Sequence, residues 1–218
     1  MSFVKICKIN YDIDTTTELD ISCKKLRKLP KKLKKLINLK KLKCSYNNLK
    51  KLENLPPNLE EIDCEYNKIE EIKNLPLKLK VFNCGYNEVK KLTNLPSSLT
   101  ILLCGDNPID KLPDLPIGMT ILRCPYTNIS DFDYLPYGLW KLECFGTDAT
   151  SFNNLPPNLC MFNCRRLKIT HFFDLPDSIE HLYIDECYVE RIKQNMPPSL
   201  RFLNGELVRD QPDCSDDE

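Results

Sequence analysis

Glycine, histidine and tryptophan are scarce in this chain of 218 residues, with six, two and one copies. Six scattered glycines cannot build the glycine-rich loop that cradles a phosphate group in many nucleotide-binding proteins. The two histidines, His171 and His181, stand apart, and the sequence shows neither clustered metal ligands nor a Ser-His-Asp or Cys-His arrangement. We therefore expect no enzyme activity, no metal site and no cofactor.

The chain also lacks a long apolar run and a net charge. Its uncharged stretches fall short of the roughly 20 residues that a membrane-spanning helix needs. The N-terminal stretch MSFVKICKINYD has neither the apolar segment nor the cleavage site of a secretory signal. The 31 basic and 31 acidic residues cancel. We expect a cytoplasmic protein without a membrane span, in which the twelve cysteines stay reduced.

Repetition is the most prominent feature that the chain does have. From Leu55 onward, a unit of the form LPxxLxxLxCxxNxIxxLxN returns seven times at a spacing of 20 residues. This unit matches the leucine-rich repeat, L-x-x-L-x-L-x-x-N/C-x-L. Two further units precede it, the first separated from the second by 23 residues, and a decayed unit ends the array near Asn204. The seven cysteines that keep the phase are Cys44, Cys64, Cys84, Cys104, Cys124, Cys144 and Cys164.

The repeat predicts a leucine-rich-repeat solenoid of about ten parallel strands. The strands form a curved sheet on the concave side. A twenty-residue unit leaves roughly nine residues for the return path, too few for a crossover helix. We therefore expect extended, polyproline-like or short 3-10 segments on the convex side and little helix. Residues 1–15 are predicted to form an N-terminal cap, residues 16–204 the repeats, and residues 205–218 an acidic tail.

Two columns of side chains are expected inside the coils. The alternation of each x-L-x-C-x segment points leucine and cysteine inward. A column of parallel thiols offers neither the dihedral angle of a disulfide nor converging zinc ligands, so we expect free, buried thiols. The asparagines satisfy turn backbone groups between coils, but the asparagine column ends half-way along the chain, which predicts a less regular C-terminal half. This second column reads Asn47, Asn67, Asn87, Asn107, Thr127, Thr147, Leu167 and Cys187.

Charge is unevenly distributed along the chain. Residues 21–52 hold twelve lysines and Arg27 without an acid, and residues 206–218 hold six acids against Arg209. We interpret the first block as a lysine-coated end of the solenoid. A basic amphipathic helix on an anionic surface, or binding of an anionic ligand or nucleic acid, stays open. Nucleic acid is less favoured because Glu61, Asp63 and Glu65 interrupt the basic positions on the strands.

The concave face carries the candidate partner-binding residues. Outward positions on strands are polar unless something covers them, yet four adjacent ones are apolar in the middle of the array. We predict a protein partner or a second copy of the chain at this place. Tyrosines along one edge either frame the patch as binding anchors or stack on each other as a ladder. The candidate residues are Val81, Ile101, Leu103 and Ile121, with Tyr46, Tyr66, Tyr86 and Tyr126.

The unit LPxxLxxLxCxxNxI resembles the short leucine-rich repeats of bacterial effectors of the YopM and IpaH class, with cysteine in place of valine. It is also similar to leucine-rich-repeat proteins of giant viruses that infect amoebae. The resemblance implies a non-catalytic protein-interaction scaffold, of effector or viral type, that acts in a host cytoplasm. An alternative is the substrate-recognition part of a ubiquitin-ligase system. Two departures stand against a close match: the first residues do not suggest the helical hairpin of YopM-like chains, and no ligase domain follows the repeats. Cys214-Ser215-Asp216 matches the Cys-x-Asp motif of those ligases, but we interpret it as part of a solvated tail.

Overall fold

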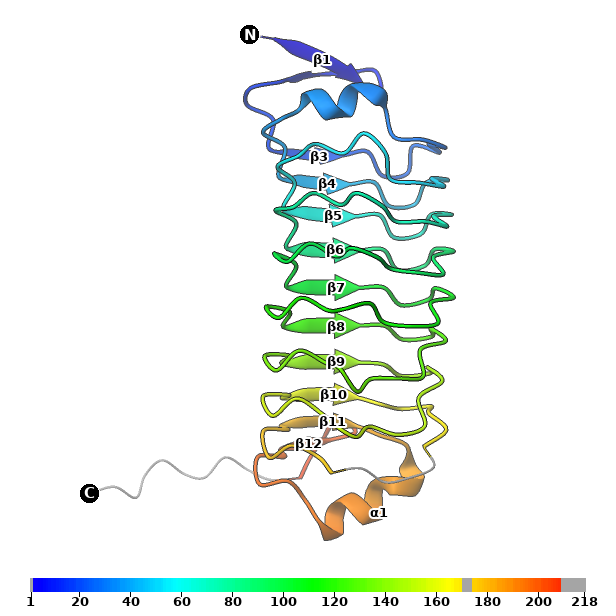
Figure 1. The fold of residues 1–218 in the computed structure, drawn as a ribbon, viewed down its shortest axis with the longest axis vertical. Helices are drawn as coiled ribbons and strands as arrows, with labels where there is room; N and C mark the ends of the chain where they lie inside the picture. The colour runs from blue at the N-terminus through cyan, green and yellow to red at the C-terminus, as the bar shows by residue number, and fades with distance from the viewer. Residues whose placement is uncertain (1, 170–173, 209–218) are drawn as a thin grey trace, which may run out of the picture.

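Ten short parallel strands stack along the long axis of the protein (Figure 1). The structure is a computed structural model that describes residues 2–169 and 174–208. Within these residues, the ten strands and an antiparallel edge strand form one sheet in chain order. The strands are β3 Glu18–Asp20, β4 Lys41–Lys43, β5 Glu61–Asp63, β6 Val81–Asn83, β7 Ile101–Leu103, β8 Ile121–Arg123, β9 Lys141–Glu143, β10 Met161–Asn163, β11 His181–Tyr183, β12 Phe202–Leu203 and the edge strand β13 Glu206–Leu207.

The pairing register follows the sequence repeat. Ile101 pairs with Ile121, twenty residues on, and this spacing holds from β4 to β11. Glu18 pairs with Lys41, which confirms the longer first unit. We call each turn of the chain a coil, and residues at equivalent positions in successive coils a column. The leucine-rich-repeat solenoid predicted from the sequence is confirmed.

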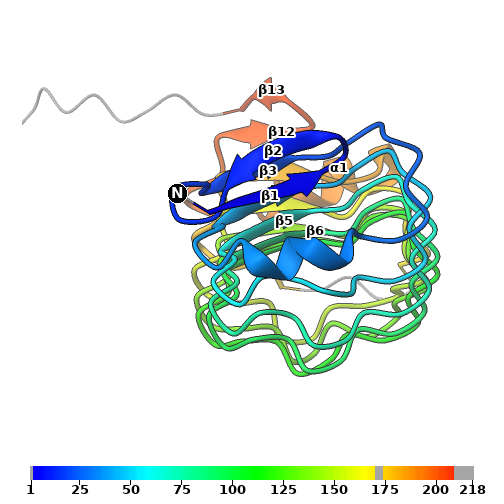
Figure 2. The ribbon, with the colours of Figure 1, turned by 90° about the horizontal axis from the view of Figure 1, so that it is seen from above.

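Seen along the solenoid axis, the sheet and the return segments enclose the interior (Figure 2), and the buried apolar side chains of the core fill it. From β4 to β10, the middle residue of each strand and the cysteine that follows the strand point inward, as Leu102 and Cys104 do with no exposed surface. All seven in-phase cysteines are buried and free, as predicted. Burial raises the pKa of Cys104 to about 12, so this thiol stays protonated. The Cys64 thiol donates a hydrogen bond of 3.2 Å to the carbonyl of Asn83.

The asparagine column connects neighbouring coils. The Asn87 amide donates to the carbonyls of Cys64 and Cys84, each at 3.1 Å. Its Oδ1 accepts a hydrogen bond of 2.9 Å from the backbone N–H of Ile69. Buried backbone groups of one coil therefore find a partner in the asparagine of the next coil. Within the described part of the chain, Thr127 donates a single hydrogen bond, to Cys124 O at 2.9 Å, so threonine replaces part of this bonding, as predicted.

The return segments contain little regular structure. One 3-10 helix, η1 Lys31–Lys35, follows Pro30 in the longer first unit. This is the single described helical segment between residues 21 and 52. The alternative that this block forms a basic amphipathic helix is therefore wrong. The lysines instead coat the first coils of the solenoid.

Each end of the solenoid is covered by an element outside the repeat. At the N-terminal end, β1 Phe3–Ile6 and β2 Ile9–Asp12 form an antiparallel hairpin across Cys7 and Lys8, which both have positive φ (Figures 1 and 2). A two-residue turn with two positive φ angles matches the right-handed twist of the strands. The hairpin buries Val4 and Ile6.

At the other end, the sequence did not predict the helix α1 Glu186–Gln194, which lies between β11 and β12. Its Ile192 is buried against the core. The segment predicted to be an acidic tail begins with β13, which pairs with β12. Cys214 lies outside the described residues.

Candidate functional site

The four apolar candidates lie next to each other on the outward side of the sheet, which we call the sheet face. Val81 pairs with Ile101, and Ile101 pairs with Ile121. Leu103 is the other outward residue of β7. The four side chains are partly exposed, whereas the middle residues of the same strands are buried. The structure thus brings these residues together, and we call them the sheet-face patch.

Charged side chains border the sheet-face patch on both sides along the solenoid axis. Toward the N-terminus, Lys41 contacts Glu61 at 3.5 Å. Toward the C-terminus, Glu143 binds Arg123 at 2.6 Å and Lys141 at 2.8 Å. These charges find partners in neighbouring coils or strands, but the apolar side chains between them have no covering element among the described residues.

Three of the four candidate tyrosines form a continuous stack along one edge of the sheet. The ring centroids of Tyr46 and Tyr66 are 4.5 Å apart, and those of Tyr66 and Tyr86 are 4.1 Å apart. Tyr46, Tyr66 and Tyr86 have positive φ angles of 53°, 50° and 52°, in the left-handed region. A hydrogen bond with Tyr66 and the nearby charge of Asp106 raise the pKa of Tyr86 to about 12. These rings therefore form the ladder that the sequence left as one of two interpretations.

Tyr126 does not belong to this stack. Asp106 occupies the position between it and Tyr86. The Tyr126 ring packs edge-on against Phe145 at 5.1 Å, and its hydroxyl accepts a hydrogen bond of 2.6 Å from Arg166. A Cβ at Gly146 would come within 2.7 Å of the Tyr126 ring, so glycine makes room for it. Tyr126 therefore leans toward the C-terminal coils.

A hollow of about 260 Å³ opens where the tyrosine stack is interrupted. It connects the sheet-face patch, through Leu103, to Tyr86 and Tyr126. Burial raises the pKa of the Asp106 carboxyl inside it. The sequence shows that aspartate replaces tyrosine at position 106 of this column. The hollow also depends on the orientation of the neighbouring rings, which the sequence does not give. Its lining residues are Glu65, Asn83, Gly85, Tyr86, Leu103, Gly105, Asp106, Arg123, Pro125, Tyr126 and Phe145.

Sequence reasoning missed a second exposed apolar surface, on the return segments. Ile117 and Tyr137 are 89% and 70% exposed, and Tyr134 is 90% exposed. The signal was present, because the residue after the Leu-Pro pair is apolar at Leu77, Ile117 and Tyr137 but is Pro57, Ser97, Pro157 or Asp177 in the other units.

The described residues contain no group of three or more histidine, cysteine or acidic side chains that could hold a metal ion. His181 stacks on Phe202 at a centroid distance of 4.7 Å. No helix in the described part of the chain is long and apolar enough to cross a membrane.

Solved structures of leucine-rich-repeat proteins resemble this protein. YopM from Yersinia enterocolitica WA-314 has a TM-score of 0.69 and 28% identity, over 78% of this chain and 42% of that one. YopM from Yersinia pestis has a TM-score of 0.62 and 26% identity, over 85% and 58%. The functional domain of InlJ from Listeria monocytogenes, which includes a cysteine ladder, has a TM-score of 0.63 and 22% identity, over 89% and 55%.

This chain therefore spans about half the length of those structures. No protein-family model matches the chain, and no curated protein does. The comparisons show the leucine-rich-repeat fold.

Proposed function

We propose that this protein is a non-catalytic scaffold that binds a protein partner through the sheet-face patch. One observation carries the proposal: Val81, Ile101 and Ile121 lie in register on three neighbouring strands, with Leu103 beside them and charged residues on both sides. Core packing does not explain apolar side chains at outward positions. An apolar centre with a charged rim is the usual composition of a protein-binding surface.

The tyrosine stack and the adjacent hollow extend this surface. Tyr66 and Tyr86 are 38% and 46% exposed, so they offer ring edges and hydroxyl groups beside the patch. Their mutual stacking fixes the rings before binding, which lowers the entropy cost of ordering them in a complex. The hollow at Asp106 offers a place for one side chain of the partner.

The likeness to YopM structures supports a partner in the cytoplasm of a host cell, where effector-type proteins act. The same patch would also serve a symmetric dimer, because an apolar surface on a two-fold axis covers itself. Both occupants need the same four side chains, so one pair of substitutions tests them together.

The test replaces Ile101 and Leu103 with aspartate. Both side chains point away from the core, so we expect the variant to fold with the circular dichroism spectrum of the wild type. Partner capture from host cytosol, measured by quantitative mass spectrometry, and any dimer seen by sedimentation should weaken by roughly 30-fold or more, the cost of a lost hot spot of about 2 kcal/mol.

The matched control replaces Ile117 and Tyr137 with aspartate, which adds the same charge on the return side. This control should keep the partners that the sheet-face variant loses. The proposal is wrong if the sheet-face variant keeps every partner and the oligomeric state of the wild type, or if the control loses the same partners.

A further inference from the structure

Charges at equivalent positions of neighbouring coils are mostly opposite in this protein. The coils lie about 4.8 Å apart, so residues of one column are close neighbours. Glu60 binds Lys40 at 2.9 Å in the coil before and Lys80 at 2.8 Å in the coil after. The pairs Lys50–Glu70 at 3.4 Å and Arg123–Glu143 at 2.6 Å follow the same rule. Alternation of this kind lowers the repulsion that a column of like charges would create.

One edge of the first two coils breaks the rule. The backbone N–H of Asn48 donates to Leu26 O at 2.8 Å, and that of Lys68 donates to Leu49 O at 2.9 Å. The two bonds are equivalent, so residues 26 and 49 belong to one column. Arg27 is consequently stacked above Lys50, and Lys28 above Lys51. Two pairs of like charges therefore lie side by side.

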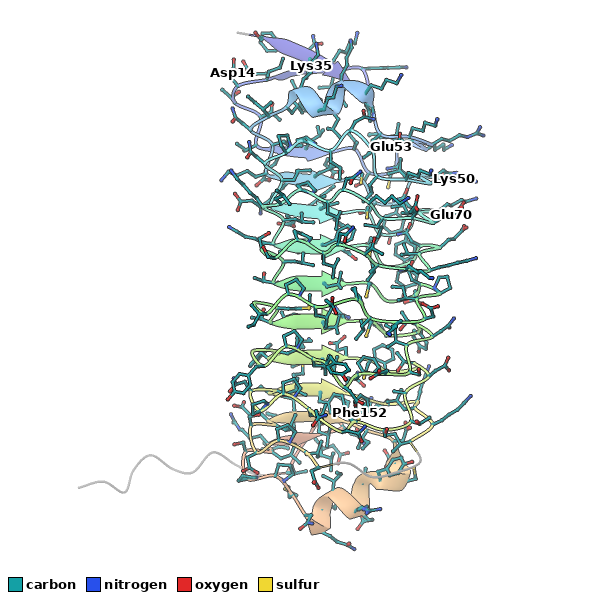
Figure 3. All side chains as sticks on the ribbon, viewed as in Figure 1. Asp14, Lys35, Lys50, Glu53, Glu70 and Phe152 are labelled. Atoms are coloured by element: carbon teal, nitrogen blue, oxygen red, sulfur yellow. The ribbon has the colours of Figure 1, made fainter. Side chains whose placement is uncertain are left out.

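A hollow of about 530 Å³ opens at this edge, which we call the basic hollow. Figure 3 shows Lys50, Glu53 and Glu70 along the same edge of the solenoid, and Lys35 at its N-terminal end. Five of the eight residues that line the basic hollow are basic, and one is acidic. The lining residues are Arg27, Lys28, Leu29, Asn48, Lys50, Lys51, Glu53 and Lys68.

The positive charge of the basic hollow is poorly compensated within the protein. Among the described residues, Arg27, Lys28 and Lys68 make no ion pair. Lys50 has one, with Glu70, and both side chains are more than half exposed. Glu71 occupies the position equivalent to Lys51 in the next coil, and its carboxylate binds Lys73.

We propose that the basic hollow binds a compact polyanion, a small soluble molecule that carries several phosphate groups. Like charges that repel in the free protein become favourable when an anion lies between them. Arg27 supplies a planar donor for a phosphate oxygen, and the lysines supply point charges. The volume falls in the range of small-molecule sites.

The basic hollow fits a compact ligand better than a nucleic acid strand. The next coil brings Glu70 and Glu71 to the same edge beside Lys68, so acidic side chains interrupt the positive charge after about two coils. A strand of nucleic acid would need basic residues to continue along its path. A ligand with its phosphate groups close together needs only the first two coils and the neighbouring Lys68.

The test measures binding of inorganic tripolyphosphate to the full chain by titration calorimetry at 50 and 150 mM salt. We expect saturable binding that weakens with salt and that raises the melting temperature. Replacing Arg27 and Lys51 with glutamine removes one charge from each like-charged pair. This variant should lose at least 10-fold in affinity, while its melting temperature without ligand stays the same or rises.

Two further variants separate a site from general attraction. Lys34→Gln with Lys35→Gln removes the same charge from η1, outside the hollow, and should change the affinity less than about 3-fold. Glu53→Gln removes the acid in the hollow and should strengthen binding. Vesicles that carry a phosphorylated lipid should not bind more tightly than tripolyphosphate. This outcome would indicate a soluble ligand rather than a lipid headgroup.

The proposal fails if tripolyphosphate does not bind at 150 mM salt, or if the η1 variant loses as much affinity as the hollow variant. It also fails if duplex DNA or the phosphorylated vesicles bind more tightly than tripolyphosphate.

Discussion

The two halves of the solenoid keep the same backbone with different side-chain support. Strand hydrogen bonds between coils do not change: Cys84 N donates to Leu103 O at 2.8 Å, and Cys124 N donates to Glu143 O at 2.8 Å. In the N-terminal half, the asparagine column adds bonds between coils. Each amide donates to its own coil and to the coil before, as Asn107 does to Cys104 and Cys84.

In the C-terminal half, aromatic packing accompanies the loss of the asparagines. Phe132 and Phe152 occupy the column that holds Leu52 and Ile72 earlier in the chain. Their ring centroids are 5.5 Å apart, and Phe152 packs edge-on against Phe162 at 5.1 Å. Figure 3 shows Phe152 among the lower coils.

The comparison teaches that the strand register does not require the asparagine column. Parallel strand pairing and a filled interior maintain the coil where threonine replaces asparagine. The asparagines instead set how strongly each turn is bound to the coil before it, because a buried backbone group without a partner costs free energy.

The largest expected effect separates the two halves directly. Asn87→Ala removes an acceptor for Ile69 N and the donor to three backbone carbonyls, so it should lower the free energy of unfolding by about 3 kcal/mol. Thr127→Ala removes one hydrogen bond and should cost about 1 kcal/mol. Urea denaturation of both variants measures the difference. Equal losses would contradict the distinction between the halves.

A smaller, opposite effect is expected from extending the asparagine column. Thr127→Asn would offer donors to Cys104 O and an acceptor to the backbone N–H of Ile109, which is the position equivalent to Val89. We expect a gain of about 1 kcal/mol, the net value of a typical added hydrogen bond. Thr127→Val, of similar volume and without a hydroxyl, is the control and should destabilise the protein. A loss on Thr127→Asn would show that the C-terminal coils no longer accommodate the amide.

The smallest effect concerns an ion-pair column of the N-terminal half and depends on pH. Hydrogen bonds from Lys80 and Lys40 lower the pKa of Glu60 to about 2, from an ordinary value of 4.5. A depressed carboxyl pKa stabilises the fold above the unfolded value, and this contribution is lost as pH falls from about 4.5 to 2. Glu60→Gln should therefore lower the urea midpoint slightly at pH 7 and lose its effect near pH 2.

The control for this last variant is Glu88→Gln, at an exposed position without an ion pair among the described residues. It should leave the midpoint unchanged at both pH values. A difference between Glu60→Gln and the wild type that persists below pH 2 would show that its cause is not the carboxyl charge.

Much of the fold follows from the repeat itself. Proline after Leu55 and alternation around Cys64 recur at a fixed spacing, so the strand pairs, the inward thiols and the outward position of Ile101 were predictable. The hairpin β1–β2 and the helix α1 were not, because each occurs once and has no neighbouring copy to reveal its pattern. The sequence also identified the four residues of the sheet-face patch, whose role in binding stays a prediction.

The sequence by itself determined the period, and the period determined which residues share a column and which face the core. Only the tertiary structure decided how side chains within a column meet. Tyr46, Tyr66 and Tyr86 stack face to face, whereas Tyr126 turns toward Arg166, because Asp106 interrupts the column and Gly146 leaves room on the other side. The basic hollow likewise depends on the size and direction of side chains at one edge. A repeat pattern fixes positions along the chain, but packing between neighbours fixes the directions of side chains.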